Sequence, residues 1–292
     1  MGKPCTGRRQ YHPARPPREG ILVIIVPTIT AIVVSYHTGP RLHECLYALK
    51  SDPSIAEVII VDNGNPPEDE AWLDSFSRDV DKVHIIRDGT NPGFGAAVNK
   101  GAAGALGELL LIINPDAVLR RGSLPVMYEA MKDRPQPVLV GGKIFDIHGR
   151  EERGGRRNTL TLTRAMGIGK WTLENDPPPE EAIEVGAVSG AFFMMNRKTF
   201  RGMGGFDEGY FLHVEDVDLC RRVLQQGGSV VYEPRAGVLH YGSTSDVPSE
   251  TVLAHKADSL ARYFRKFASG PLEKALVAII SPFFLRMLKA RA

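Results

Sequence analysis

Apolar and amphipathic stretches alternate along the first half of the chain. Strand-like apolar runs cover 31–35, 57–61, 83–87 and 108–113. Helical spacing separates them, and in the segment 41–50 the residues Leu42, Cys45, Leu46 and Leu49 fall on one face. This alternation predicts an α/β fold, with a mostly parallel sheet and helices on both of its faces.

The second half follows a less regular pattern. Further strands are expected at 138–145, 188–196, 229–232 and 237–241. The stretch 149–157 is charged and rich in glycine, and we expect a mobile loop there. From Ser249 onward two helices are expected, separated by the sequence Ser-Gly-Pro at 269–271.

Three acidic residues, Glu215, Asp216 and Asp218, begin a helical pattern. Negative charge is favourable at a helix N-terminus, so a purely structural role would account for the cluster taken alone. The functional interpretation is a general base facing a cleft. A second motif, Asn-Pro-Asp at 114–116, directly follows a buried-strand pattern and favours that interpretation. Open α/β sheets place ligand and metal groups at such strand tips.

Taken together, these segments resemble the family 2 nucleotide-sugar glycosyltransferases, which have the GT-A fold. The resemblance extends from about Thr30 to about Ser245, with its motifs in family order. The motifs are a first strand at 32–36, a strand ending in Asp62-Asn63-Gly64, an Asn- and Gly-rich element at 91–101, Asn-Pro-Asp at 114–116, Glu215-Asp216 and His240. The resemblance implies a GT-A nucleotide-diphospho-sugar transferase fold, with additional helices at the C-terminus.

The resemblance also implies a divalent cation, Mg²⁺ or Mn²⁺, that neutralises the leaving diphosphate. Asp116 is the first candidate ligand and His240 the second, because such cations suit carboxylate ligands and a late histidine reaches the metal in some family members. The family element is Asp-x-Asp, whereas Asn114 stands here at the first position. One missing charge predicts weaker metal binding by the protein alone. The alternatives are a simple turn at 114–116 and a structural role for His240.

The nucleotide-sugar is expected to be bound by residues that follow the early strands. The resemblance implies the set Ser35, Tyr36, Asp62, Asn91, Gly93, Asn99 and Asn114. Glycine permits close approach of the backbone, and a helix start offers free N–H groups to a phosphate or ribose. A turn or helix-cap role is the alternative for Asp62 and Asn99.

Asp216 is the candidate catalytic base. In the inverting members that this chain resembles, the aspartate of a Glu-Asp pair deprotonates the acceptor hydroxyl, which then attacks the anomeric carbon. Glu215 is expected to tune Asp216, since neighbouring carboxylates raise the free-energy cost of ionising both. Asp218 is expected to serve the helix start or to pair with Arg221 or Arg222.

The branch that the chain most resembles transfers L-rhamnose from dTDP-L-rhamnose to a lipid-linked or polysaccharide acceptor during cell-wall or surface-glycan synthesis. One alternative is a family 2 transferase that uses a UDP- or GDP-sugar. Another is a catalytically inactive nucleotide-sugar-binding or scaffold protein, which the missing acid at Asn114 keeps open and the intact Glu215-Asp216 pair disfavours. A nucleotide-binding domain of another class is disfavoured because the Walker lysine motif is absent from the sequence.

Composition adds expectations about partners and location. A formal net charge of +2 over 292 residues gives no signature of a nucleic-acid partner. Basic residues gather at both ends, and those near the C-terminus flank the apolar stretch 271–289, which predicts contact with a membrane surface. Docking of that stretch on the catalytic domain, or on the second subunit of a homodimer, is the alternative.

The chain is therefore expected to have three parts. Residues 1–29 form a basic, Pro-rich and partly disordered extension, residues 30–245 a GT-A domain, and residues 246–292 a helical region with a membrane-surface role. The three cysteines form no metal-binding or disulfide pattern and fit a reducing compartment. We expect a cytoplasmic protein, peripheral on the inner face of the cell membrane.

Overall fold

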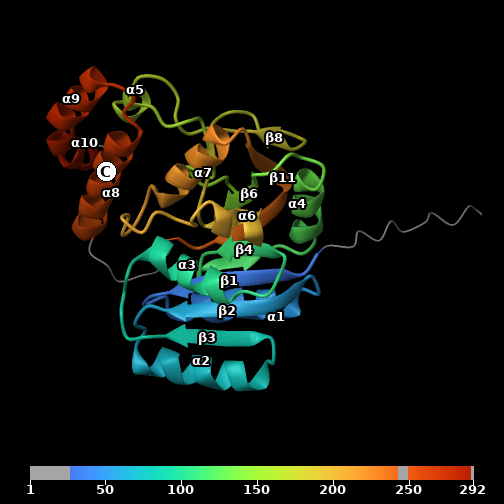
Figure 1. The fold of residues 1–292 in the computed structure, drawn as a ribbon. Coiled ribbons are helices and arrows are strands. Elements are labelled where there is room, and N and C mark those ends of the chain that lie inside the picture. The colour runs from blue at the N-terminus through green and yellow to red at the C-terminus, as the bar shows by residue number, and fades with distance from the viewer. Residues whose placement is uncertain (1–26, 243–248, 291–292) are drawn as a thin grey trace, which may run out of the picture.

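The computed structural model describes residues 27–242 and 249–290, so most of the expected N-terminal extension lies outside the described residues. Within them, a nine-stranded sheet has the order β3-β2-β1-β4-β10-β6-β11-β5, with β8 paired to β11, and a small second sheet pairs β7 with β9. Figure 1 shows β1, β2, β3 and β4 side by side. The strands are β1 (Ile29–Ser35), β2 (Ile55–Asp62), β3 (Val83–Arg87), β4 (Leu109–Ile113), β5 (Ala117–Leu119), β6 (Val138–Phe145), β7 (Arg156–Arg157), β8 (Ile183–Glu184), β9 (Ala187–Val188), β10 (Phe192–Asn196) and β11 (Ser229–His240).

The expected α/β fold is confirmed. β1 pairs in parallel with β2 and β4, and β2 pairs in parallel with β3. The chain after β4 adds β6 and β11, which are parallel to each other, and the antiparallel strands β10, β5 and β8. Ser35 and Asp62 are partners at the carboxyl ends of β1 and β2. Polar side chains that follow these strands therefore meet at one edge of the sheet.

Helices cover both faces of the sheet (Figure 1). The helices of the sheet region are α1 (Arg41–Ser51), α2 (Pro67–Asp79), α3 (Phe94–Gly104), α4 (Ser123–Met131), α6 (Arg197–Gly202) and α7 (Glu215–Gln225). Apolar residues of α1, α2 and α4 fill one core, and those of α3, α6 and α7 fill the other. α3 lies close to the sheet, because a Cβ at Gly101 would come within 2.9 Å of Ile32 Cγ2.

A third apolar cluster joins the C-terminal helices to the rest of the domain. These helices are α8 (Ser249–Phe267), α9 (Pro271–Ile280), the short 3₁₀ helix η1 (Ser281–Phe283) and α10 (Phe284–Lys289), and α5 (Leu162–Ala165) lies beside them in Figure 1. Tyr263, Phe264 and Phe284 are buried there together with Tyr210 and Val217. No helix in the described ranges is long and apolar enough to cross a membrane.

Several sequence-based expectations need correction. The strand expected at 188–196 is two strands, β9 and β10, which belong to different sheets. The two helices expected from Ser249 onward are α8, α9, η1 and α10. The segment 149–157 is not entirely a loop, because Arg156 and Arg157 form β7, pair with β9 and are buried. Glu151 accepts a hydrogen bond from the Arg156 guanidinium, and Asp216 accepts one from the Arg157 guanidinium. These bonds offset the free-energy cost of burying the two arginines. The two short strands expected at 229–232 and 237–241 are one strand, β11, whose register shifts between Glu233 and Gly237.

Candidate active site

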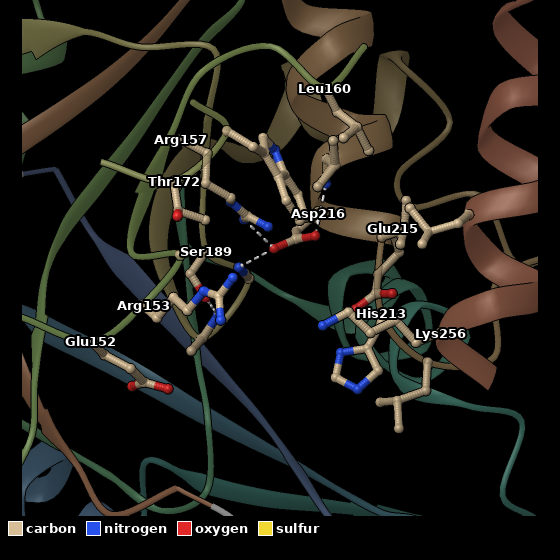
Figure 2. Close-up of a pocket in the computed structure, with 18 of the residues that line it drawn as sticks. Glu152, Arg153, Arg157, Leu160, Thr172, Ser189, His213, Glu215, Asp216 and Lys256 are labelled. Carbon is tan, nitrogen blue, oxygen red and sulfur yellow. Dashed lines mark hydrogen bonds and ion pairs between the residues drawn. The ribbon is translucent and has the colours of Figure 1, made fainter. Parts of the chain in front are cut away.

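A cavity of about 540 Å³ lies where the sheet edge meets the C-terminal helices. Asn114 and His240 line it from strand ends, Glu215 and Asp216 from the start of α7, and Lys256 from α8. Figure 2 shows several of these side chains converging from different elements. The cavity therefore brings Asn114 together with Glu215 and Asp216, which follow it by about one hundred residues, whereas Asp116 contacts His240 and is not among the lining residues.

The start of α7 aims Asp216 at the cavity. The chain enters the helix through His213 and Val214, whose φ angles of 67° and 71° are in the left-handed region. Asp216 Oδ2 accepts hydrogen bonds from Arg157 Nη2 at 2.6 Å and from the Gly190 amide at 2.9 Å. Its Oδ1 accepts one from the Val217 amide at 2.8 Å. Three donors from three segments thus fix the orientation of this carboxylate.

The two neighbouring acids of α7 have opposite pKa shifts. Burial raises the pKa of Asp216, but the Arg157 guanidinium and the backbone amides outweigh burial and hold its pKa below the usual range. Burial and the charge of Asp216 raise the pKa of Glu215 to about 8. Glu215 Oε2 is buried and has no hydrogen-bond partner among the described residues. Asp216 is therefore the ionised member of the pair at neutral pH.

His240 joins the other acidic group. Its Nε2 lies 3.1 Å from Asp116 Oδ1 and 3.2 Å from Asn114 Nδ2, and its Nδ1 lies 2.6 Å from Glu152 Oε2. Burial lowers the pKa of His240, yet the two carboxylates outweigh burial and raise it to about 10. The expected partners Asn114, Asp116 and His240 are thus adjacent, and Glu152 is an addition from the segment expected to be a loop.

These groups have suitable chemistry for a divalent cation. A carboxylate, a histidine and a second carboxylate offer oxygen and nitrogen donors within one cluster. Across residues 27–242 and 249–290, no set of three His, Cys, Asp or Glu side chains is arranged around a common metal position. Asp116 and His240 therefore fit a cation by donor type, and the diphosphate of a substrate would have to complete the coordination.

Asp62 and Ser35 form a separate polar cluster at the ends of β1 and β2. Asp62 accepts hydrogen bonds from the Gly64 and Asn65 amides and from Arg87 Nε at 2.7 Å. Burial raises the pKa of Asp62, but Arg87 and these amides outweigh burial and lower it overall. Ser35 Oγ donates to Asn65 Oδ1 at 3.0 Å, so Asn65 links the two predicted residues.

Tyr36, Asn91 and Gly93 border this cluster. Tyr36 is 37% exposed at the end of β1. Asn91 Oδ1 accepts hydrogen bonds from Asn63 Nδ2 and from the Gly93 amide. Gly93 has a φ of 91° and packs so closely on the Phe211 backbone that a Cβ would not fit there.

Asn99 lies apart from both clusters. Its amide nitrogen donates to Phe206 O at 2.9 Å and to Glu208 Oε1 at 3.0 Å, and its oxygen accepts from the Phe206 amide at 2.8 Å. The side chain therefore holds the segment that leads to α7. Asn99 therefore acts by holding this loop, and its side chain does not line the cavity.

Sequence reasoning did not identify the cationic side chains of the cavity. Arg153 and Arg157 come from the stretch interpreted as a mobile loop, and Lys256 comes from the C-terminal helical region. The sequence held one signal for these cations, the adjacent residues Arg156 and Arg157 after two glycines. Adjacent arginines in a short strand need partners when they are buried. Asp218, in contrast, pairs with Arg222 at 2.6 Å as expected.

The chain has the GT-A fold, which two solved glycosyltransferase structures share with it. A crystal structure of GalNAc-T7 with UDP, GalNAc and Mn²⁺ matches with a TM-score of 0.63 at 17% identity, over 89% of this chain and 54% of that chain. The mannosyltransferase PcManGT from Pyrobaculum calidifontis, in complex with GDP-Man and Mn²⁺, matches with a TM-score of 0.56 at 17% identity, over 90% of this chain and 73% of that chain. These likenesses show the shared fold.

The model of glycosyl transferase family 2 matches residues 30–204, and the chain belongs to this family. It is 29% identical over 252 residues to the N-acetylglucosaminyl-diphospho-decaprenol L-rhamnosyltransferase of Mycobacterium tuberculosis, covering 78% of this chain and 81% of the relative. It is 24% identical over 226 residues to the rhamnosyltransferase WbbL of Escherichia coli K12, covering 72% of this chain and 82% of the relative. Asp216 lies beyond the segment matched by the family model, so its role has to be argued from geometry.

Proposed function

We propose that this family 2 protein is an inverting, metal-dependent glycosyltransferase that transfers L-rhamnose from dTDP-L-rhamnose to a lipid-linked or polysaccharide acceptor. The observation that carries the proposal is the position of Asp216. An ionised carboxylate faces the same cavity as Asn114 and His240 at the strand ends. A base and a diphosphate-binding region on a common cavity are what a single displacement at an anomeric carbon requires.

In the proposed reaction, the acceptor hydroxyl gives its proton to Asp216 as its oxygen attacks the anomeric carbon. The bond between this carbon and the diphosphate breaks, and the diphosphate departs with the electron pair. Arg157 and the Gly190 amide hold Asp216 in position. Asp116 would hold the divalent cation, and His240 would join it after losing the proton that Asp116 and Glu152 stabilise. The cation would supply Lewis-acid stabilisation of the leaving diphosphate.

The choice of dTDP-L-rhamnose as the donor rests on the names of relatives rather than on a contact in the cavity. Two of the relatives are named as rhamnosyltransferases, and one of them is named for a diphospho-lipid acceptor. Asp62 and Ser35 at the ends of β1 and β2 are proposed to contact the nucleotide, with Tyr36, Asn91 and Gly93 beside them. Asn99 is proposed to act indirectly, because its contact with Phe206 holds the segment that leads to α7. A UDP- or GDP-sugar is the alternative donor.

A thermal-shift panel tests nucleotide choice. The melting temperature is measured with dTDP, UDP, GDP or CDP, each with Mg²⁺, Mn²⁺ or a chelator. A ligand that binds only the folded state raises the melting temperature, so a metal-dependent rise with dTDP is expected. An equal or larger rise in melting temperature with UDP or GDP would indicate a UDP- or GDP-sugar as the donor, and the proposed mechanism would still apply. No response to any nucleotide in folded protein would favour an inactive or scaffold role.

A further inference from the structure

The cationic side chains of the cavity are not all neutralised by the protein. Arg157 is paired with Asp216 at 2.6 Å. Arg153, whose side chain is 77% exposed, reaches only Glu174, at 3.9 Å. Lys256 has no ion-pair partner within the described part of the chain, although it lines the cavity from α8. Among the described residues, Arg153 and Lys256 are therefore the cations of the cavity wall without a close carboxylate partner. Figure 2 shows both side chains there.

The position of Lys256 carries a free-energy cost in the free protein. Burial lowers the pKa of this ammonium group, the nearby charges of Arg157 and Arg153 lower it further, and the opposing charge of Asp216 does not offset them. Glu215 lines the same cavity, but burial raises its pKa to about 8, so it provides little negative charge at neutral pH. A partly buried cation without an ion-pair partner carries a free-energy cost unless something else compensates its charge. An anionic ligand would provide that compensation.

The wall around Lys256 is apolar. Leu253, Lys256 and Leu260 follow helical spacing on one face of α8, and all three line the cavity. Met287 and Leu288 of α10 line it as well. An ammonium group surrounded by aliphatic side chains suits a ligand in which a phosphate is attached directly to a hydrocarbon chain. A free sugar or a nucleotide would leave this apolar surface unmatched.

Two substrates of the proposed reaction carry a diphosphate, namely the nucleotide-sugar and a lipid-linked acceptor. The polar clusters at the ends of β1 and β2, including Asp62, do not line this cavity, whereas α8 and α10 form one of its walls. We propose that Lys256 and Arg153 form an anion subsite for the diphosphate of a prenyl-type lipid acceptor, with the lipid chain along Leu253, Leu260 and Met287. This subsite rests on the proposed function, because the sugar on that lipid would present its hydroxyl to Asp216.

Binding of geranyl diphosphate, a short prenyl diphosphate without sugar, tests the subsite. Isothermal titration with the full chain is performed with Mg²⁺, with and without saturating dTDP, and geraniol serves as the uncharged probe. Lys256→Met and Arg153→Ala should each weaken geranyl diphosphate binding about tenfold, as expected for loss of a charged hydrogen bond. Lys256→Arg should retain binding. Arg265→Ala, an exposed cation on the same helix and outside the cavity lining, should bind like the wild type.

The subsite is supported if geranyl diphosphate binds in the presence of dTDP, geraniol binds much more weakly, and Lys256→Met leaves dTDP binding unchanged. Displacement of geranyl diphosphate by dTDP would overturn the proposal, because the cations would then serve the donor. Equal affinity in wild type and Lys256→Met, or no binding to folded wild type, would also overturn it. Wild-type binding of dTDP alone reports on the proposed function, so the two failures are distinguishable.

Discussion

At the scale of single residues, the central contact is the ion pair between Arg157 and Asp216. The carboxylate of Asp216 is mostly buried, and burial alone would favour its neutral form. The Arg157 guanidinium reverses that preference and also fixes the direction of the carboxylate. We infer that Arg157 is a positioning residue, which keeps the base ionised over the working pH range.

Arg157→Met should therefore change the pH dependence of turnover. A base must be ionised to act, so activity is lost as the pH falls through its pKa. Without the guanidinium the pKa of Asp216 rises, and the acidic limb of the pH–kcat profile should move upward by about one to three pH units. Steady-state rates measured between pH 5 and pH 9 check this shift.

Arg156→Met is the matched control for that experiment. Arg156 is also buried, but it pairs with Glu151 and not with Asp216. Its loss should lower stability and leave the acidic limb in place. An acidic limb that moves equally in both variants, or in neither, would contradict the role assigned to Arg157.

Single residues also show the limits of sequence reasoning. Glu215 and Asp216 were identifiable because a helical pattern followed them and a second acidic motif preceded them. Arg153, Arg157 and Lys256 were not, because a local pattern does not tell which distant segments a cation will face. Their partners and surroundings arise only when β7, α7 and α8 pack together.

At the scale of elements, Asp218 connects α7 to α8. Its carboxylate is fully buried and accepts hydrogen bonds from Tyr210, Arg222 and Lys266. Lys266 belongs to α8, so this single acid ties the helix that carries the base to the helix that forms the cavity wall. The sequence predicted the pairing with an arginine of α7 and gave no sign of the contact with α8.

Asp218→Asn should destabilise the protein by about 3 kcal/mol, because two cations lose a buried counter-charge. Urea unfolding followed by circular dichroism measures the free energy of unfolding. Asp79→Asn, at an exposed position of α2, should change it by less than about 0.5 kcal/mol. Unfolding free energies that differ little between the two variants would show that Asp218 does not link the helices energetically.

At the scale of the whole molecule, the parallel half of the fold was predictable and the additions to it were not. Apolar runs ending in polar residues identified β1, β2 and β4 and the edge where they end. The antiparallel strand β10 lies between β4 and β6 through pairings that no local pattern specifies. The C-terminal helices were expected, but their share in the cavity wall emerged only from the structure.

These C-terminal helices present apolar side chains to the solvent. Leu272, Ile279 and Phe283 are 86%, 66% and 53% exposed, and the basic residues Lys274 and Arg286 are exposed near them. An apolar surface with basic neighbours suits an anionic membrane surface. We propose that α9 and η1 contact the membrane, which would place the acceptor subsite close to its lipid substrate.

Vesicle co-sedimentation tests this contact. The protein should bind vesicles of phosphatidylglycerol and phosphatidylcholine, and the combined change Leu272→Ser, Ile279→Ser and Phe283→Ser should weaken binding at least about tenfold. Leu106→Ser, at another exposed apolar position, is the control. Undiminished binding by the triple variant would assign the exposed surface to another partner, such as a second copy of the chain.

The most direct test of the account is turnover by Asp216→Asn. Release of dTDP from dTDP-L-rhamnose is measured with Mg²⁺ and a prenyl-diphosphate-linked sugar acceptor, alongside dTDP affinity by titration. We predict that kcat falls by about 100- to 10,000-fold while dTDP affinity stays unchanged, because the base acts in the chemical step and not in donor binding. Wild-type-like turnover in Asp216→Asn, or a wild type that binds dTDP without releasing it from the sugar, would contradict the account.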